Sequence, residues 1–201
     1  MSIHIDGKKI TAMYWGGRKI REAWYEGQRV FSGKPVEVMP PTPNWYDAQD
    51  WLRGRLTEYG ESYQTVKEIP FEIDTGESSN LDSMFRGCSS LTTVPDMDTS
   101  QVTNMLSMFD GCSSLTTAPV MDTSQATDMR SMFRDCSSLT TVPDMDTRNV
   151  TDVSDMFRGC SSLTDGNVRL IGKRTGVSTV RMIRDSGLTR EPFYDSSGQP
   201  I

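Results

Sequence analysis

The residues best suited to chemistry in this chain are four cysteines, which recur at a fixed interval. Each lies 24 residues after the one before it, at Cys88, Cys112, Cys136 and Cys160. Thiols stacked at about the 5 Å spacing of neighbouring strands could form disulfides, or could pack as small apolar side chains. A metal site is the weaker alternative, because no Cys-x-x-Cys occurs and His4 is the only histidine.

A series of aspartates follows the same interval. Its members are Asp74, Asp98, Asp122 and Asp146, with Asp96 and Asp144 beside them. A column of carboxylates could hold calcium. Each carboxylate could instead cap a helix by accepting hydrogen bonds from its free N–H groups. The Thr and Ser residues that follow these aspartates favour capping.

Neither series forms a catalytic constellation. The chain has no Gly-rich phosphate loop, no H-E-x-x-H and no G-x-S-x-G. We therefore expect a protein that is not an enzyme and that uses neither a metal nor a cofactor.

A binding surface, if the repeats carry one, would lie on the outward residues of their extended segments. These are Thr92, Thr93, Asp96, Thr116, Thr117, Thr140, Thr141 and Asp144, with Val120 nearby. Such threonines could bond a glycan or a protein edge. They are also good strand formers on any solvated face.

The element that positions these residues is a repeat running from Leu81 to Thr164. A period of 24 is typical of a leucine-rich-repeat solenoid, in which each unit buries its apolar face by stacking on a neighbour. The expected core columns are Phe85, Phe109, Phe133 and Phe157, the four cysteines, and Leu91, Leu115, Leu139 and Leu163. The predicted fold class is α+β.

Each unit is predicted to contain a short strand, a turn and a helical or 3₁₀ segment. In the unit from Leu91, Val102, Met105 and Met108 recur at helical spacing. Pro95 and its counterparts cannot donate to a ladder, so we expect strands of three or four residues.

The two ends of the repeats differ from the middle. We predict a domain over 44–201, with a capping helix at 45–59 whose apolar face carries Trp45, Ala48, Leu52, Leu56 and Tyr59. Repeats occupy about 64–164, beginning with a degenerate copy at 65–80. A C-terminal cap at 165–201 would contain a helix near 178–186 and a loose tail.

Residues 1–32 hold a different repeat, with a period of ten. Asp-Gly, Gly-Gly and Glu-Gly turns predict a four-stranded antiparallel meander at about 2–5, 8–15, 18–25 and 28–31. Its candidate docking residues are Tyr14, Trp15, Trp24 and Tyr25. The meander could pack on the solenoid or dock on another chain. Residues 33–43, with four prolines, are predicted to be a linker.

Composition restricts the partners. The chain has 201 residues, of which 35% are hydrophobic and 24% charged, with no run of 18 apolar residues that could span a membrane. The N-terminus lacks the apolar segment of a secretory signal. The net charge is +3 over 1–32, −5 over 33–80, −6 over 81–164 and +2 over 165–201. An acidic repeat disfavours nucleic acid as a partner.

The block from Asp98 to Met105, together with Met-Phe-x-x-Cys-x-x-Leu, resembles the BspA-like subclass of leucine-rich repeats over about residues 64–190. The chain departs from that pattern by a shorter strand segment with a proline. Residues 1–32 resemble more loosely the opening segments of minor tail proteins of phages that infect Gram-positive hosts.

These resemblances imply a function in adhesion. BspA-like proteins are typically bacterial surface adhesins, and similar repeats occur in phage and prophage proteins. We therefore expect a virion component, such as a minor tail or receptor-binding protein. It would contact other virion proteins through 1–32 and a host glycan or protein through the repeats. The alternatives are a bacterial cell-surface adhesin and a protein-binding scaffold, and a homo-oligomer stays open.

Overall fold

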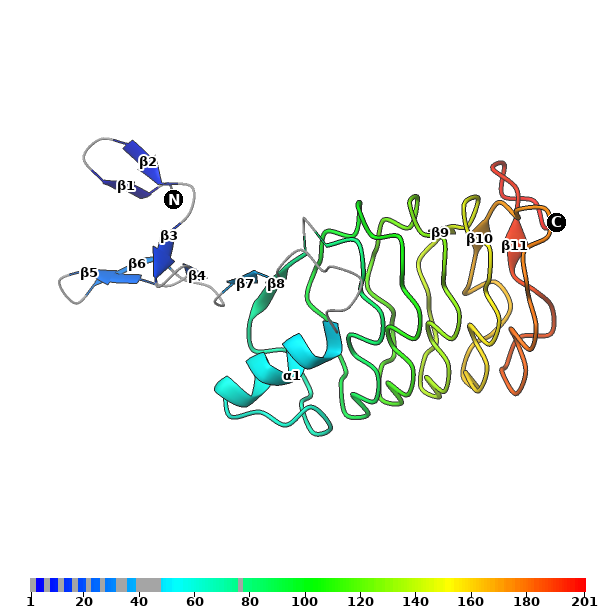
Figure 1. Cartoon of the computed structure of the whole chain (residues 1–201), viewed down its shortest axis with the longest axis horizontal. Coiled ribbons are helices and arrows are strands. Elements are labelled where there is room, and N and C mark those ends of the chain that lie inside the picture. Colours follow the sequence, from blue (N-terminus) through cyan, green and yellow to red (C-terminus); the bar gives the residue numbers. More distant parts are fainter. Residues whose placement is uncertain are drawn as a thin grey trace.

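The computed structural model describes residues 48–75 and 78–201, together with the backbone of seven short strands between residues 3 and 38. Beyond the helix α1 (Ala48–Glu58), the chain winds into similar coils that lie side by side in one row, with the C-terminus at the far end (Figure 1). Parallel bridges join positions 24 residues apart, from Asn80 to Asn104 and onward to Asp128 and Asp152. The sequence period is therefore the length of one coil.

Stacked phenylalanines form the centre of the coils. The rings of Phe85, Phe109, Phe133 and Phe157 are fully buried. Successive ring centroids are 5.3, 5.4 and 5.8 Å apart, and the planes are within 4° of parallel. This spacing is close to the distance between neighbouring strands, so each ring contacts the same residue type in the next coil. The cysteine and leucine columns are also fully buried.

The segment predicted as helical is a pair of turns, and that prediction is wrong. The N–H of Cys88 donates to Phe85 O within its own coil at 3.0 Å, but the N–H of Phe85 donates to Met108 O of the next coil at 2.9 Å. Ser83 and Gly87 have φ angles of 57° and 79°, in the left-handed region that a helix cannot contain. Their conformation turns alternate N–H groups outward to the neighbouring coil.

The extended segments are also shorter than predicted. Most contacts between them are single bridges, as between Glu68 and Thr93 or Thr117 and Thr141. From one coil to the next, two-residue pairing occurs at β9 (Met145–Asp146), β10 (Leu170–Ile171) and β11 (Phe193–Tyr194), which form one parallel sheet. The proline in each early coil removes an N–H from the ladder, which accounts for the interruption.

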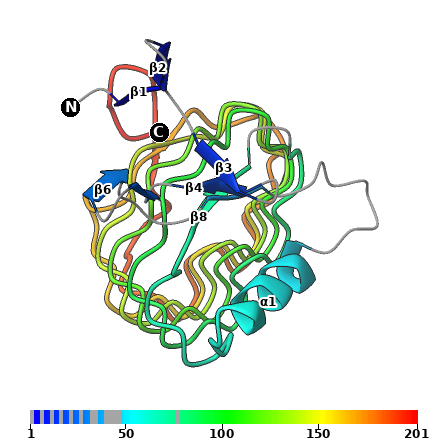
Figure 2. The same ribbon diagram turned by 90° about the vertical axis from the view of Figure 1, so that its left-hand side faces the viewer.

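Helix α1 covers the N-terminal end of the coils along one edge (Figure 2). It starts at Ala48; Trp45 lies outside the described residues, and the tryptophan that packs on the core is Trp51, 8% exposed. The cap also supplies hydrogen bonds that a preceding coil would have provided. Tyr63 Oη donates to Met84 O at 2.9 Å, and Gln49 Nε2 donates to Arg86 O at 2.8 Å.

The N-terminal segment forms three hairpins instead of a four-stranded meander. They are β1 (Ile3–Ile5) with β2 (Lys8–Ile10), β3 (Met13–Trp15) with β4 (Arg18–Ile20), and β5 (Ala23–Tyr25) with β6 (Gln28–Phe31). Each predicted long strand is divided in two. Residues 8–15 contain β2 and β3, and residues 18–25 contain β4 and β5.

The expected linker contains a strand. Strand β7 (Val36–Val38) pairs in parallel with β8 (Glu72–Asp74) and antiparallel with β4. The resulting order β3-β4-β7-β8 joins one N-terminal hairpin to the edge of the first coil. Residues 33–43 therefore include a structural contact with the repeats.

The C-terminal end is more ordered than predicted. Residues 178–186 repeat the two-turn motif, with left-handed φ at Arg181 and Asp185, so the predicted helix is absent. The tail is folded rather than loose. Ile201 N donates to Phe193 O at 3.1 Å, and the Asp195 carboxylate accepts from Ser197 and Gln199. This turn covers the outer edge of β11.

Candidate functional site

The candidate site is the coil face, defined as the exposed side of residues 92–98, 116–122 and 140–146. All six predicted threonines and the carboxylates of Asp96 and Asp144 are exposed there. Their outward position follows from the preceding leucine of each coil, which is fully buried. A Leu-Thr-Thr sequence therefore anchors the chain in the core and presents two hydroxyls.

The threonines of the coil face are not equivalent. Thr92 Oγ1 donates to Lys67 O at 2.9 Å, and Thr140 Oγ1 donates to Thr116 O at 3.0 Å, so these hydroxyl protons hold adjacent coils together. The hydroxyls of Thr93, Thr117 and Thr141 make no hydrogen bond to the described residues. These three hydroxyls are able to donate to a ligand, as is that of Thr116, which makes no hydrogen bond within the described part of the chain either.

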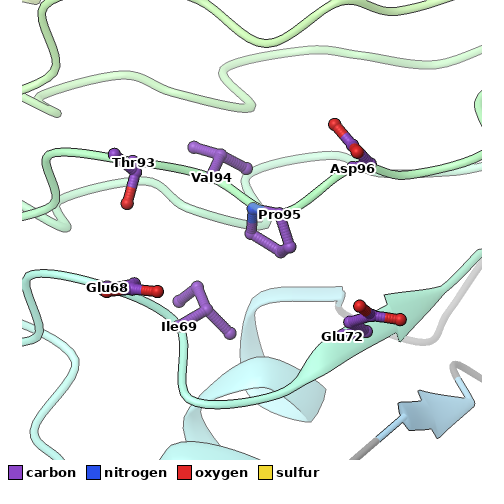
Figure 3. Close-up of a pocket in the computed structure, with 7 residues that line it drawn as sticks. All are labelled: Glu68, Ile69, Glu72, Thr93, Val94, Pro95 and Asp96. Atoms are coloured by element: carbon purple, nitrogen blue, oxygen red, sulfur yellow. The ribbon is translucent and has the colours of Figure 1, made fainter. Parts of the chain in front are cut away.

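A groove opens the coil face at its N-terminal end (Figure 3). It has a volume of about 660 Å³. The lining residues are Glu68, Ile69, Glu72, Thr93, Val94, Pro95 and Asp96. Carboxylates surround a floor of aliphatic side chains and a proline, an arrangement that suits a ligand with both apolar and donor groups.

The first coil contains one additional residue beside the groove. Glu68 bridges Thr93, 25 residues further on. Beyond the groove the offset returns to 24, because Thr75 and Thr99 donate to equivalent carbonyls at Asp98 and Asp122. The additional residue is accommodated where Phe71 turns inward onto the cap: its ring lies 6.4 Å from that of Trp51 and 5.0 Å from that of Tyr59.

The aspartate column forms turns rather than helix caps. Asp98 Oδ1 accepts the N–H of Ser100 at 3.0 Å, and Asp122 Oδ1 accepts that of Ser124 at 2.9 Å. These hydrogen bonds lower the pKa of both carboxyls, which therefore remain ionised at neutral pH. Within 48–75 and 78–201, no three His, Cys, Asp or Glu residues are grouped so as to hold a metal ion.

Two further columns were missed by the sequence reasoning. Asn80, Asn104, Asp128 and Asp152 each accept the N–H two residues ahead. Buried threonines at 75, 99, 123 and 147 donate to carbonyls of the next coil. The signal was present, since all eight positions keep the 24-residue interval.

The cysteines act as internal donors. Sγ of Cys112, Cys136 and Cys160 lies 3.1, 3.0 and 2.8 Å from the carbonyl oxygen of the phenylalanine 27 residues earlier. All four are free and buried, and burial raises the pKa of Cys88 and Cys160 to about 12. A thiol held in its neutral form is a poor nucleophile, so these cysteines are not suited to catalysis. Their contacts with carbonyl oxygens of the preceding coil stabilise the stack.

The predicted docking residues belong to the hairpins. Tyr14 and Trp15 fall in β3, and Trp24 and Tyr25 fall in β5. Their side chains lie outside the part of the chain that the structure describes.

Stacked 24-residue coils with an exposed face define a repeat protein. The chain belongs to the family described as Mycoplasma protein of unknown function, DUF285, whose family model matches residues 63–180. The match begins just beyond α1 and ends in the last two-turn motif, so it covers the coils. No match is found among curated proteins or among solved structures. Across the described residues, no helix is long and apolar enough to cross a bilayer.

Proposed function

We propose that this chain is a non-enzymatic binding protein of a phage or prophage virion, which presents its coil face to the surface of the host. The observation that carries the proposal is the coil face itself. Three successive coils expose the same pattern of threonines, and a groove of about 660 Å³ lies at its N-terminal end. Repetitive faces of this kind suit binding to extended partners.

The hairpins support attachment to a particle. They carry six Lys or Arg against three Asp or Glu, whereas the coils are acidic. An isolated two-stranded hairpin is marginally stable, which favours packing of β1–β2 and β5–β6 against other virion proteins. The pairing of β7 with β8 would transmit that attachment to the coils.

We further propose that the coils are leucine-rich repeats of the BspA-like type. The support is the Met-Phe-x-x-Cys-x-x-Leu pattern and its 24-residue stacking. An adhesin on the bacterial cell surface is the alternative location for the same coil face.

Mass spectrometry of purified phage-like particles from the source strain tests the location. We expect to find peptides spanning residues 1–201 in washed particles. The number of copies per particle should stay the same after a wash at high salt. Recovery from washed cell envelopes, with none in particles, would contradict the virion proposal and favour the adhesin.

A further inference from the structure

Charge is distributed unevenly along the axis of the coils. From Gly87 to Met129 the chain contains five aspartates and neither lysine nor arginine. From Thr164 to Arg190 it contains six Lys or Arg and two aspartates. The coil face itself carries Asp96 and Asp98 in its first coil, Asp122 in its second, and Asp144 and Asp146 in its third. Asp110 and Asp128 lie off this face and pair with Arg86 and Arg130.

Equivalent carboxylates of the coil face have different partners. Asp144 lies 3.3 Å from Arg169, and Asp146 forms an ion pair with Arg148. Their counterparts one and two coils earlier, Asp96, Asp98 and Asp122, are exposed and form no ion pair within the described part of the chain. The negative charge of the first two coils of the face is thus directed to solvent.

The same region carries exposed apolar surface. Val120 is 78% exposed, the largest value among the described large hydrophobic residues. It occupies the position of Asp96 and Asp144 in the middle coil, beside Pro119. In the groove, Val94 and Pro95 lie between Thr93 and Asp96, with Ile69 opposite them (Figure 3).

We infer that the groove and the first two coils of the face bind a partner protein through a segment carrying lysine or arginine together with aliphatic side chains. This inference rests on the proposed binding function and specifies its partner. Long cationic side chains have an aliphatic stem and a charged head. Their stems would lie on Val94 and Pro95 and their heads near Asp96, while an aliphatic neighbour would contact Val120.

Charge complementarity favours this partner over two others. A polyanion, such as a phosphodiester polymer, is repelled by the first two coils of the face. A neutral glycan can bond the Thr93 and Thr117 hydroxyls but gains nothing from the field of the aspartates. A cationic protein segment uses the hydroxyls, the apolar positions and the charge together.

The test measures binding of the labelled full chain to intact host cells. Asp96→Lys is compared with Glu61→Lys, an exposed carboxylate just after α1 that undergoes the same change of charge. We expect Asp96→Lys to weaken binding about tenfold, equivalent to about 1.4 kcal/mol, and Glu61→Lys to stay within twofold. Binding of the unsubstituted chain should weaken as salt rises, because exposed charges are screened.

Treatment of the cells distinguishes the partner class. Surface proteolysis should abolish binding, and periodate oxidation of glycans should leave it intact. Binding that survives proteolysis, or that Asp96→Lys leaves unchanged, overturns the inference while the proposed binding function stands. If the unsubstituted chain binds no cells, the proposed function fails and the inference fails with it. Thermal melts of both variants verify that each is folded.

Discussion

The interior coils and the two terminal regions satisfy the same backbone groups by different means. In the interior, Phe109 N donates to Met132 O and Phe133 N to Met156 O, each from coil to coil. At the N-terminal end, side chains of Gln49 and Tyr63 replace the absent coil. Interior stability is therefore a property of neighbouring repeats, and terminal stability is a property of individual side chains.

The last coil at the C-terminal end has different residues at the phenylalanine and cysteine positions. Ile183 stands where the interior has phenylalanine and is only partly buried, and Ser186 stands where the interior has cysteine. Ser186 Oγ donates to Ile183 O at 2.7 Å within its own turn, whereas the interior thiols donate to the preceding coil. A smaller apolar residue and a hydroxyl suit a coil that faces water on one side.

The largest expected effect is the loss of one interior ring. Phe133→Ala should lower the free energy of unfolding by about 3–5 kcal/mol, because Phe133 contacts a ring on each side and its removal leaves a cavity in the core. Ile183→Ala is the matched control at the terminal coil and should have less than about half of that effect. Urea denaturation measures both. Equal effects would contradict the distinction between interior and end.

Alkaline pH should destabilise the interior through its thiols. Burial raises the pKa of Cys160 to about 12, against about 8.5 in an unfolded chain. The folded state therefore retains a proton that the unfolded state loses, and the free energy of unfolding falls as pH rises from about 8.5 toward 12. The slope is about 1.4 kcal/mol per pH unit for each such thiol.

Cys160→Ala isolates that contribution. Its free energy of unfolding should decline less steeply with pH than that of the unsubstituted chain, while the two slopes agree below about pH 8. Denaturation series at pH 7 to 10 measure the slopes. Parallel curves across that range would show that Cys160 titrates normally when folded.

The Tyr63 hydroxyl of the N-terminal cap should contribute to the stability of the fold. Tyr63→Phe removes the donor to Met84 O and the acceptor of Gln49 Nε2, and should lower the free energy of unfolding by about 1–2 kcal/mol. Urea denaturation of the variant and the unsubstituted chain measures the loss. A change of less than about 0.5 kcal/mol would indicate that the cap acts by packing alone.

The smallest expected effect is at the terminal turn. Ser186→Ala removes, at a partly exposed site, the hydroxyl that donates to Ile183 O and accepts the N–H of Leu188. It should lower the free energy of unfolding by about 0.5–1 kcal/mol. Ser186→Cys restores the interior residue type and should not exceed the stability of the unsubstituted chain. A clear gain from Ser186→Cys would show that the terminal coil is not adapted to water.

The sequence predicts the core columns well, because burial of Phe85, Cys88 and Leu91 is enforced by their repetition. It misleads about the turns: Met105, Met108 and Cys112 have helical spacing, but left-handed residues such as Ser107 direct alternate N–H groups to the next coil. Helical periodicity cannot distinguish these cases, since both bury every third or fourth residue.

The groove was not predicted, although the change of register beside it can be found in the sequence. Ile69-Pro70 lies 25 residues before Val94-Pro95, whereas Asp74-Thr75 lies 24 residues before Asp98-Thr99. The structure has the same change of offset between Glu68 and Thr75. The antiparallel pairs β1–β2, β3–β4 and β5–β6 were predicted as parts of a four-stranded meander, and their separation into three hairpins was not. Pairing of β7 with β8 joins positions far apart in the chain, and no local pattern specifies it.

Hydroxyl-radical footprinting on host cells tests most directly whether the coil face is the binding surface. Val120 and Val180 are the two most exposed valines described, at 78% and 60%, and only Val120 lies on the coil face. We predict that oxidation of Val120 falls several-fold when the full chain is cell-bound, while that of Val180 is unchanged. Protection of Val180 with Val120 still fully reactive would contradict the account, because the partner would then occupy the turns of the last coil.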